Sequence, residues 1–188
     1  MRPTWFMDNW AEHGGLLETV RAEGRVYSAS GGGRIPWVSK TDIAACAYSA
    51  LTAEAPPNGD IVVLGPELLS YEQVNLTLRH QALPPLYLLI RSFLASRPVE
   101  LTESQCADIL SEVIGKEVIH VNLTVEELAE RHVKNAGLNK EYAQVLASMD
   151  ISIKGGSEER LNDVVLRVTG GKPKTFGEFA LENKSVWL

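Results

Sequence analysis

The chain has 188 residues, with 18 Lys and Arg against 24 Asp and Glu, and a net charge of -6. This acidic balance argues against nucleic-acid binding, since neutralising phosphates requires clustered cations. The longest apolar run, residues 83–95, is too short for a membrane span, and residues 1–10 show no secretory signal. We therefore expect a soluble, cytoplasmic protein with neither nucleic-acid nor membrane partners.

Hydrophobic periodicity and cap residues predict helices that alternate with strands. In chain order, the expected elements are a helix at 15–23, a strand at 25–28, a helix at 43–53, a strand at 60–64, a helix beginning at Ser70, a helix at 102–114, a strand at 117–121, and helices beginning at Thr124, Asn139 and Thr175. Asp42 is expected as an N-cap or first-turn acid, and glycines 31–33 as a turn. This alternation predicts an α/β fold.

Residues 75–106 interrupt an otherwise regular pattern. If position 74 is joined directly to position 107, one helix face carries the apolar residues Val74, Ile109, Leu110, Val113 and Ile114. We therefore interpret residues 75–106 as an insertion, such as a translated intron. A natural helical hairpin is the alternative.

Motifs for catalysis or metal binding are missing from the sequence. The glycines at 31–33 are followed by Arg-Ile-Pro rather than by a helix that would receive a phosphate. The four histidines are far apart and have no metal-ligand spacing, and Cys46 lies in an apolar stretch typical of a buried, inert thiol. The spacing predicts no metal site and no catalytic residue.

Six segments carry a family resemblance. They are M-R-P-T-W-F-M-D-N-W (1–10), G-G-G-R-I-P-W-V-S-K-T-D-I-A (31–44), V-V-L-G-P-E-L-L-S-Y-E-Q-V (62–74), K-E-V-I-H-V (116–121), A-S-M-D (147–150) and T-F-G-E-F-A (175–180). Together they resemble NmrA-like proteins, an atypical branch of the short-chain dehydrogenase/reductase superfamily. Within that branch they look closest to the festuclavine and agroclavine dehydrogenases of ergot alkaloid biosynthesis.

The resemblance implies a fold and a domain organisation. In such proteins the R-P-T-W-F-M segment follows the sixth strand of the nucleotide-binding sheet, whereas here it begins at Met1. The chain is thus expected to be the C-terminal, substrate-side half of an NmrA-like Rossmann protein, lacking the N-terminal nucleotide-binding strands. Residues 1–74 would hold the end of the Rossmann sheet and the start of the substrate-binding region, and residues 107–188 a helical substrate-binding region.

The implied reaction is the reduction of a cyclic iminium on a tricyclic indole by NADPH. The chain would contribute the substrate side, and a separately encoded N-terminal Rossmann half would bind most of the NADPH. Two other interpretations stay open. The chain can be a non-enzymatic NmrA-like interaction or regulatory module, or an inactive, truncated gene product.

The resemblance also points to site residues. The implied substrate-binding residues are Trp5, Phe6, Met7, Asp8, Asn9 and Trp10, and the implied cofactor-binding residues are Pro3 and Thr4. Aromatic faces suit a flat cation, and Asp8 or Asn9 would orient its nitrogen. The alternatives are core roles for Trp5 and Phe6, packing for Met7 and a helix cap for Asn9. Trp187 is a further candidate, if it folds back over the pocket.

Overall fold

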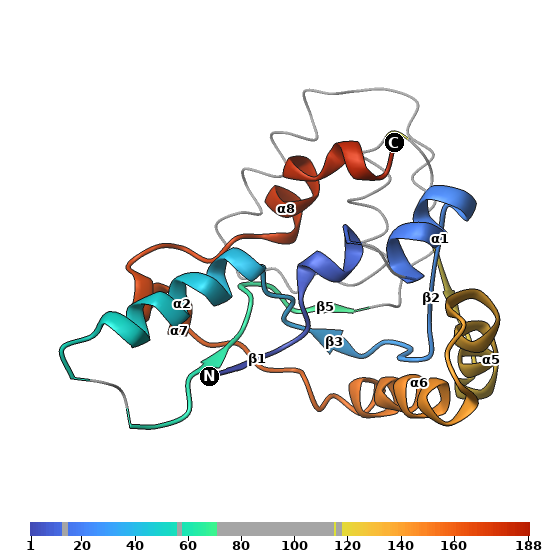
Figure 1. Cartoon of the computed structure of the whole chain (residues 1–188), viewed down its shortest axis with the longest axis horizontal. Coiled ribbons are helices and arrows are strands. Elements are labelled where there is room, and N and C mark those ends of the chain that lie inside the picture. Colours follow the sequence, from blue (N-terminus) through green and yellow to red (C-terminus); the bar gives the residue numbers. More distant parts are fainter. Residues whose placement is uncertain (13–14, 56–57, 71–114, 116–117) are drawn as a thin grey trace.

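The computed structural model describes residues 1–12, 15–55, 58–70, 115 and 118–188, and it shows a mixed α/β chain (Figure 1). The α/β class expected from the sequence is confirmed. The expected insertion at 75–106 and the expected helix at 102–114 lie outside the described residues. None of the helices within the described part has the length and apolar character needed to span a membrane.

A parallel strand pair begins the fold. β1 (Arg2–Pro3) pairs with β4 (Val62–Val63), and α2 (Lys40–Thr52) lies between them in the sequence. Parallel strands need such a crossover, and Cys46 of α2 is buried in one cluster with Val63 of β4. The expected strand at 60–64 is therefore present, although only Val62 and Val63 pair with a neighbour.

The described part of the chain contains two further strand pairs. β2 (Arg25–Ser28) and β6 (Ile119–Asn122) are parallel, whereas β3 (Arg34–Ile35) and β5 (Leu69–Ser70) are antiparallel. Ser70 is the last residue of β5 and is paired with Arg34, and the helix that it was expected to cap lies outside the described residues. The strand pairing itself was not expected, because Arg34 lies far from Ser70 in the sequence.

Helices surround these strands, and most begin where the sequence predicts. α1 spans Gly15–Glu23, α5 Val125–Ala136, α6 Lys140–Lys154, α7 Val164–Thr169 and α8 Phe176–Glu182, with 3-10 turns η1 at Met7–Trp10 and η2 at Lys184–Val186. The capping box of α5, the Asn139 cap of α6 and the capping box of α8 are all formed. In Figure 1, α5 and α6 pack side by side at one end of the molecule.

The start of α2 is capped by the residue before it. Ser39 is the cap, since its Oγ accepts a hydrogen bond of 3.1 Å from the backbone N–H of Asp42. Asp42 lies in the first helical turn, which is the second of the two roles expected for it. Its carboxylate accepts a 2.7 Å hydrogen bond from the Ser39 hydroxyl.

The largest apolar cluster of the described part is rich in aromatic residues. It joins η1, α1, α8 and the chain's last residues, and its largest fully buried side chains include Trp10, Trp37, Phe176 and Trp187. A second cluster lies between α5 and α6, and a third lies beneath α2 around Cys46. Burial raises the pKa of the Cys46 thiol, as expected for an inert cysteine.

Candidate functional site

The N-terminal segment passes from the parallel strand pair into the aromatic cluster. The backbone N–H of Thr4 still donates to the Val63 carbonyl at 3.1 Å. The chain then runs beside Val38, whose N–H donates to the Trp5 carbonyl at 3.0 Å and whose carbonyl accepts from Met7 N–H at 2.9 Å. These bonds fix the backbone on both sides of Trp5.

Edge-to-face ring contacts hold the aromatic side chains. The Trp5 and Trp37 ring centroids lie 6.2 Å apart, those of Trp10 and Trp37 5.6 Å, and those of Trp10 and Phe176 5.4 Å. This geometry is favoured by the ring quadrupole. Trp187 folds back onto the cluster, and its indole Nε1–H donates to the Trp10 carbonyl at 2.7 Å. Its ring also packs edge to face on Phe179 at 6.3 Å, so Trp187 is part of the core.

The expected substrate-binding residues divide into a buried and an accessible set. Met7 and Trp10 are buried, with 0% and 1% of their surface exposed. Trp5 is half-buried, Phe6 is 38% exposed, and Asn9 is exposed. Trp5, Phe6 and Asn9 are therefore open to solvent, whereas Met7 and Trp10 belong to the buried core.

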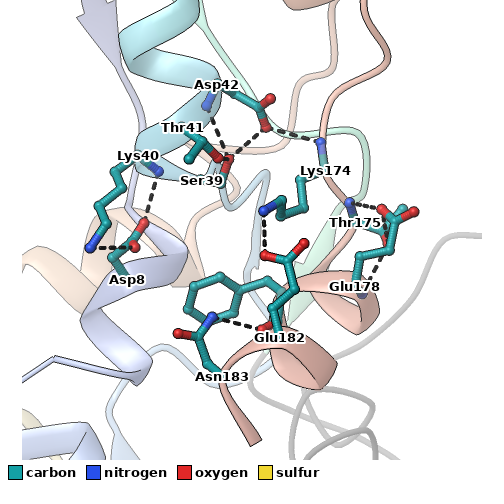
Figure 2. A network of polar contacts seen from close by, with 11 residues as sticks. Asp8, Ser39, Lys40, Thr41, Asp42, Lys174, Thr175, Glu178, Glu182 and Asn183 are labelled. Atoms are coloured by element: carbon teal, nitrogen blue, oxygen red, sulfur yellow. Dashed lines mark hydrogen bonds and ion pairs between the residues drawn. The ribbon is translucent and has the colours of Figure 1, made fainter.

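Asp8 is engaged with the start of α2, as Figure 2 shows. One carboxylate oxygen accepts a 2.8 Å hydrogen bond from the backbone N–H of Lys40, and the other lies 3.2 Å from the Lys40 ammonium. The Lys40 ammonium also contacts Glu12, and the hydrogen bonds to Glu12 and Asp8 raise the pKa of Lys40. A carboxylate at a helix N-terminus is stabilised by the free backbone N–H groups there. Asp8 thus ties η1 to α2.

The same polar network reaches α8 (Figure 2). The Asp42 carboxylate accepts the backbone N–H of Lys174 at 2.9 Å, in addition to the Ser39 hydroxyl. The next residue, Thr175, caps α8 in a capping box with Glu178. The V-S-K-T-D and T-F-G-E-F-A motifs therefore interact through one polar network, which positions η1, α2 and α8 relative to one another.

The expected cofactor-binding residues lie where the chain leaves β1. Pro3 is exposed, and the Thr4 hydroxyl donates to the Glu158 carboxylate at 3.0 Å. The carboxyl end of a parallel strand is the usual place for a dinucleotide in α/β folds. Glu158 gave no signal in the sequence, because its partner is 154 positions away.

Trp37 is a second residue that the sequence analysis did not single out. It contacts both Trp5 and Trp10, and its backbone is approached by Gly65, where a Cβ would lie 1.6 Å from the Trp37 carbonyl oxygen. Its place inside the P-W-V-S motif was the available signal. The glycine of the G-P-E-L-L-S-Y motif is thus required by this close backbone approach.

A buried polar group lies between β2 and β6. The Ser28 hydroxyl is 3.0 Å from His120 Nε2 and 3.0 Å from the Ser30 hydroxyl. Burial lowers the pKa of His120 to about 4, so the imidazole is neutral at ordinary pH. The Asp150 carboxylate accepts a hydrogen bond from the Ala29 N–H at 2.6 Å, and burial raises the pKa of Asp150.

Across the described residues, no cluster of three or more His, Cys, Asp or Glu side chains is placed to hold a metal ion.

Solved structures share this fold. Triphenylmethane reductase of Citrobacter sp., in complex with NADP(H), matches 97% of the chain with a TM-score of 0.64 and 20% identity. NADPH-dependent quinone oxidoreductase QOR2 of Escherichia coli, in complex with NADPH, matches 96% with a TM-score of 0.68 and 19% identity. The chain covers 51% of each of these proteins. Its fold is that of about half of an NAD(P)-binding reductase.

Comparison of sequences gives a narrower set of similar proteins. Over its whole length, the chain is 37% identical to agroclavine dehydrogenase of Claviceps fusiformis and 36% identical to festuclavine synthase II of Penicillium roqueforti. No family model matches the chain. The chain is thus a relative of the agroclavine and festuclavine dehydrogenases, as the motifs indicated, and it spans 54% of the length of these two proteins. That share agrees with the expectation of a C-terminal half.

Proposed function

We propose that this chain forms the substrate side of an NADPH-dependent clavine-type reductase. In the proposed reaction, NADPH delivers a hydride to the carbon of a cyclic iminium, which becomes an amine while the cofactor becomes NADP⁺. Whole-length similarity to clavine dehydrogenases supports the substrate class. The observation that carries the proposal is the passage of the chain from parallel strand β1 directly into the aromatic cluster of Trp5, Trp10 and Trp37.

An iminium is already electrophilic, so the reaction requires positioning and exclusion of water rather than a general acid. Trp5 and Phe6 present accessible aromatic surface to a flat cation, an attraction of about 0.5–2 kcal/mol per contact. Met7 and Trp10 support them from below. Of the two polar residues considered for the iminium nitrogen, Asn9 is exposed and Asp8 is held by Lys40. We therefore assign contact with the iminium nitrogen to Asn9. Asp8, through its bond to Lys40, positions the turn that carries Asn9.

NADPH would be held mainly by a nucleotide-binding half outside these residues, either a partner chain or a further segment of the same polypeptide. Pro3 and Thr4 fit the nicotinamide end of the cofactor, because they lie at the carboxyl end of parallel strand β1. The pyrophosphate needs a Gly-rich loop at a helix N-terminus, and the sequence offers none. When bound, the cofactor supplies the hydride.

The test is NADPH consumption by the chain after its N-terminus is joined to the unmatched part of the Claviceps fusiformis relative. With a clavine iminium, the joined protein should consume NADPH. Trp5→Ala should raise KM by about 2- to 30-fold, the equivalent of one lost cation–π contact, and leave NADPH binding unchanged. Tyr142→Ala, which removes an exposed ring on α6, is the matched control and should change neither quantity.

The decisive outcome concerns chemistry rather than binding. If the joined protein folds and binds NADPH but does not oxidise it with any clavine iminium, the enzyme proposal fails. A non-enzymatic NmrA-like module then takes its place. If Trp5→Ala and Tyr142→Ala behave alike, the aromatic segment is a core element and not a substrate surface.

A further inference from the structure

Helix α2 carries an apolar stripe that is left open to solvent. Tyr48 is 71% exposed and Leu51 is 86% exposed, and Ala44 is also exposed. Spacings of four and three residues place these side chains on one face of the helix. We call this set the α2 stripe. Large apolar side chains that line up on one exposed helix face indicate a contact surface.

The opposite flank of α2 is already covered. Cys46 is fully buried in one cluster with Val63 of β4 and Val165 of α7. Ser49 and Ala50 line a hollow together with residues of α7. At about 3.6 residues per turn, these positions lie on the side of the helix opposite the stripe. α7 packs along α2 (Figure 1), on the flank opposite the stripe.

The strand pair next to α2 is open at β1. α7 contacts both α2 and β4, and the stripe lies on the flank of α2 away from α7. The N–H groups of Arg2 and Thr4 both donate to the β4 side, to carbonyls of Ile61 and Val63. Within the part of the chain that the structure describes, β1 pairs with β4 alone. Parallel sheets are normally continued and covered by helices on both faces.

We propose that the α2 stripe is the docking surface for a helix of the nucleotide-binding half. This inference rests on the proposed function and names the surface by which the two halves join. The occupant follows from length and geometry, since the chain spans only 54% of its clavine dehydrogenase relatives. Strands that extend the sheet past β1 would bring a crossover helix onto the face that α2 covers, beside the stripe. The face of that crossover helix that contacts the α2 stripe is expected to be apolar.

The experiment compares the chain alone with the joined protein described above. Tyr48→Glu with Leu51→Glu should lower the Tm of the joined protein by about 5 °C or more, and should leave the Tm of the 188-residue chain unchanged. Tyr142→Glu with Val145→Glu is the matched control, a tyrosine and an aliphatic residue three positions apart on the exposed face of α6. The control pair should have the same small effect in both proteins.

A labelling measurement covers the case in which the charged pair disrupts folding. In a Cys106→Ser background, a maleimide should label Leu51→Cys at least about tenfold more slowly in the joined protein than in the chain alone. Val145→Cys should react equally fast in both. Equal rates at position 51, or equal Tm changes in both proteins, would overturn the proposal.

One other occupant has its own signature. If the unmodified chain self-associates and the Tyr48→Glu, Leu51→Glu pair abolishes that association, a second copy covers the stripe and the proposal is wrong. None of these measurements uses NADPH consumption. An inactive joined protein that still protects position 51 would therefore refute the proposed function and leave the docking surface standing.

Discussion

His120 should make the chain's stability depend on pH below neutrality. The residue lies on β6 opposite Val26 and within 3.0 Å of the Ser28 hydroxyl. Its pKa is lowered by burial to about 4, from an ordinary value of 6.5. Between these two values the unfolded chain binds a proton that the folded chain excludes. The free energy of unfolding therefore decreases as the pH falls through this interval.

The size of the effect follows from the width of the interval. At about 1.4 kcal/mol per pH unit, the interval from 6.5 to about 4 corresponds to about 3.5 kcal/mol as an upper limit. Most of it, about 2 to 3 kcal/mol, should be lost between about pH 7 and about pH 4.5. That is a large part of the stability of an ordinary domain.

Urea unfolding followed by tryptophan fluorescence measures this loss, with His120→Gln as the reference. Glutamine keeps a polar partner for Ser28 and does not titrate. His132, with a pKa lowered by burial, and Asp150, with a pKa raised by burial, titrate in both proteins and cancel in the difference. Asp150 alone would act in the opposite direction, since its contribution is lost as the pH rises. A wild-type minus variant difference that stays constant over this pH range would refute the reasoning.

Other predictions test the site's supports. Asp8→Ala should cost about 1–2 kcal/mol of stability by removing the bond to Lys40 N–H, whereas exposed Glu12→Ala should cost less than about 0.5 kcal/mol, both in urea unfolding. Gly65→Ala should destabilise by about 3 kcal/mol or more because of its approach to the backbone of residue 37, and Gly59→Ala, with open space around it, should be near neutral in the same assay. The 188 residues alone should not bind NADPH tightly, so micromolar or tighter binding in a fluorescence titration would contradict the proposed division of the cofactor site.

Local signals in the sequence predicted local structure well. The capping box that begins at Thr124 and the cap at Asn139 set the starts of α5 and α6, because a cap acts within one helical turn. The helix at 15–23 and the strand at 25–28 have the expected bounds. α7 was missed, since six residues hold too little periodicity to distinguish it from a loop.

Long-range pairing could not be predicted from these signals. The antiparallel pairing of Ser70 with Arg34 has no local signal in the sequence, because the two strands are far apart along the chain. Asp42 and Ser39 both suit an N-cap, and only the geometry shows that Ser39 has that role. The hydrogen bond from Trp187 to Trp10 spans 177 positions, so its existence depends on the assembled core. Residues 75–106 lie outside the described part, and their interpretation as an insertion stays a prediction.

The sequence predicted the site as a run of neighbouring residues, and the structure shows which of their side chains are buried and which are exposed. The 3-10 turn of η1 sends Met7 and Trp10 inward and leaves Phe6 and Asn9 outside, an arrangement that neither a period of two nor one of 3.6 describes. Trp37 contacts both Trp5 and Trp10. Because Trp10 is in turn packed against Phe176 and bonded to Trp187, the accessible Trp5 is supported through Trp37 by the chain's C-terminal segment. If the proposed reductase is correct, substrate positioning depends on both ends of the chain. Residues with no contact to the substrate then affect hydride transfer through the orientation of Trp5.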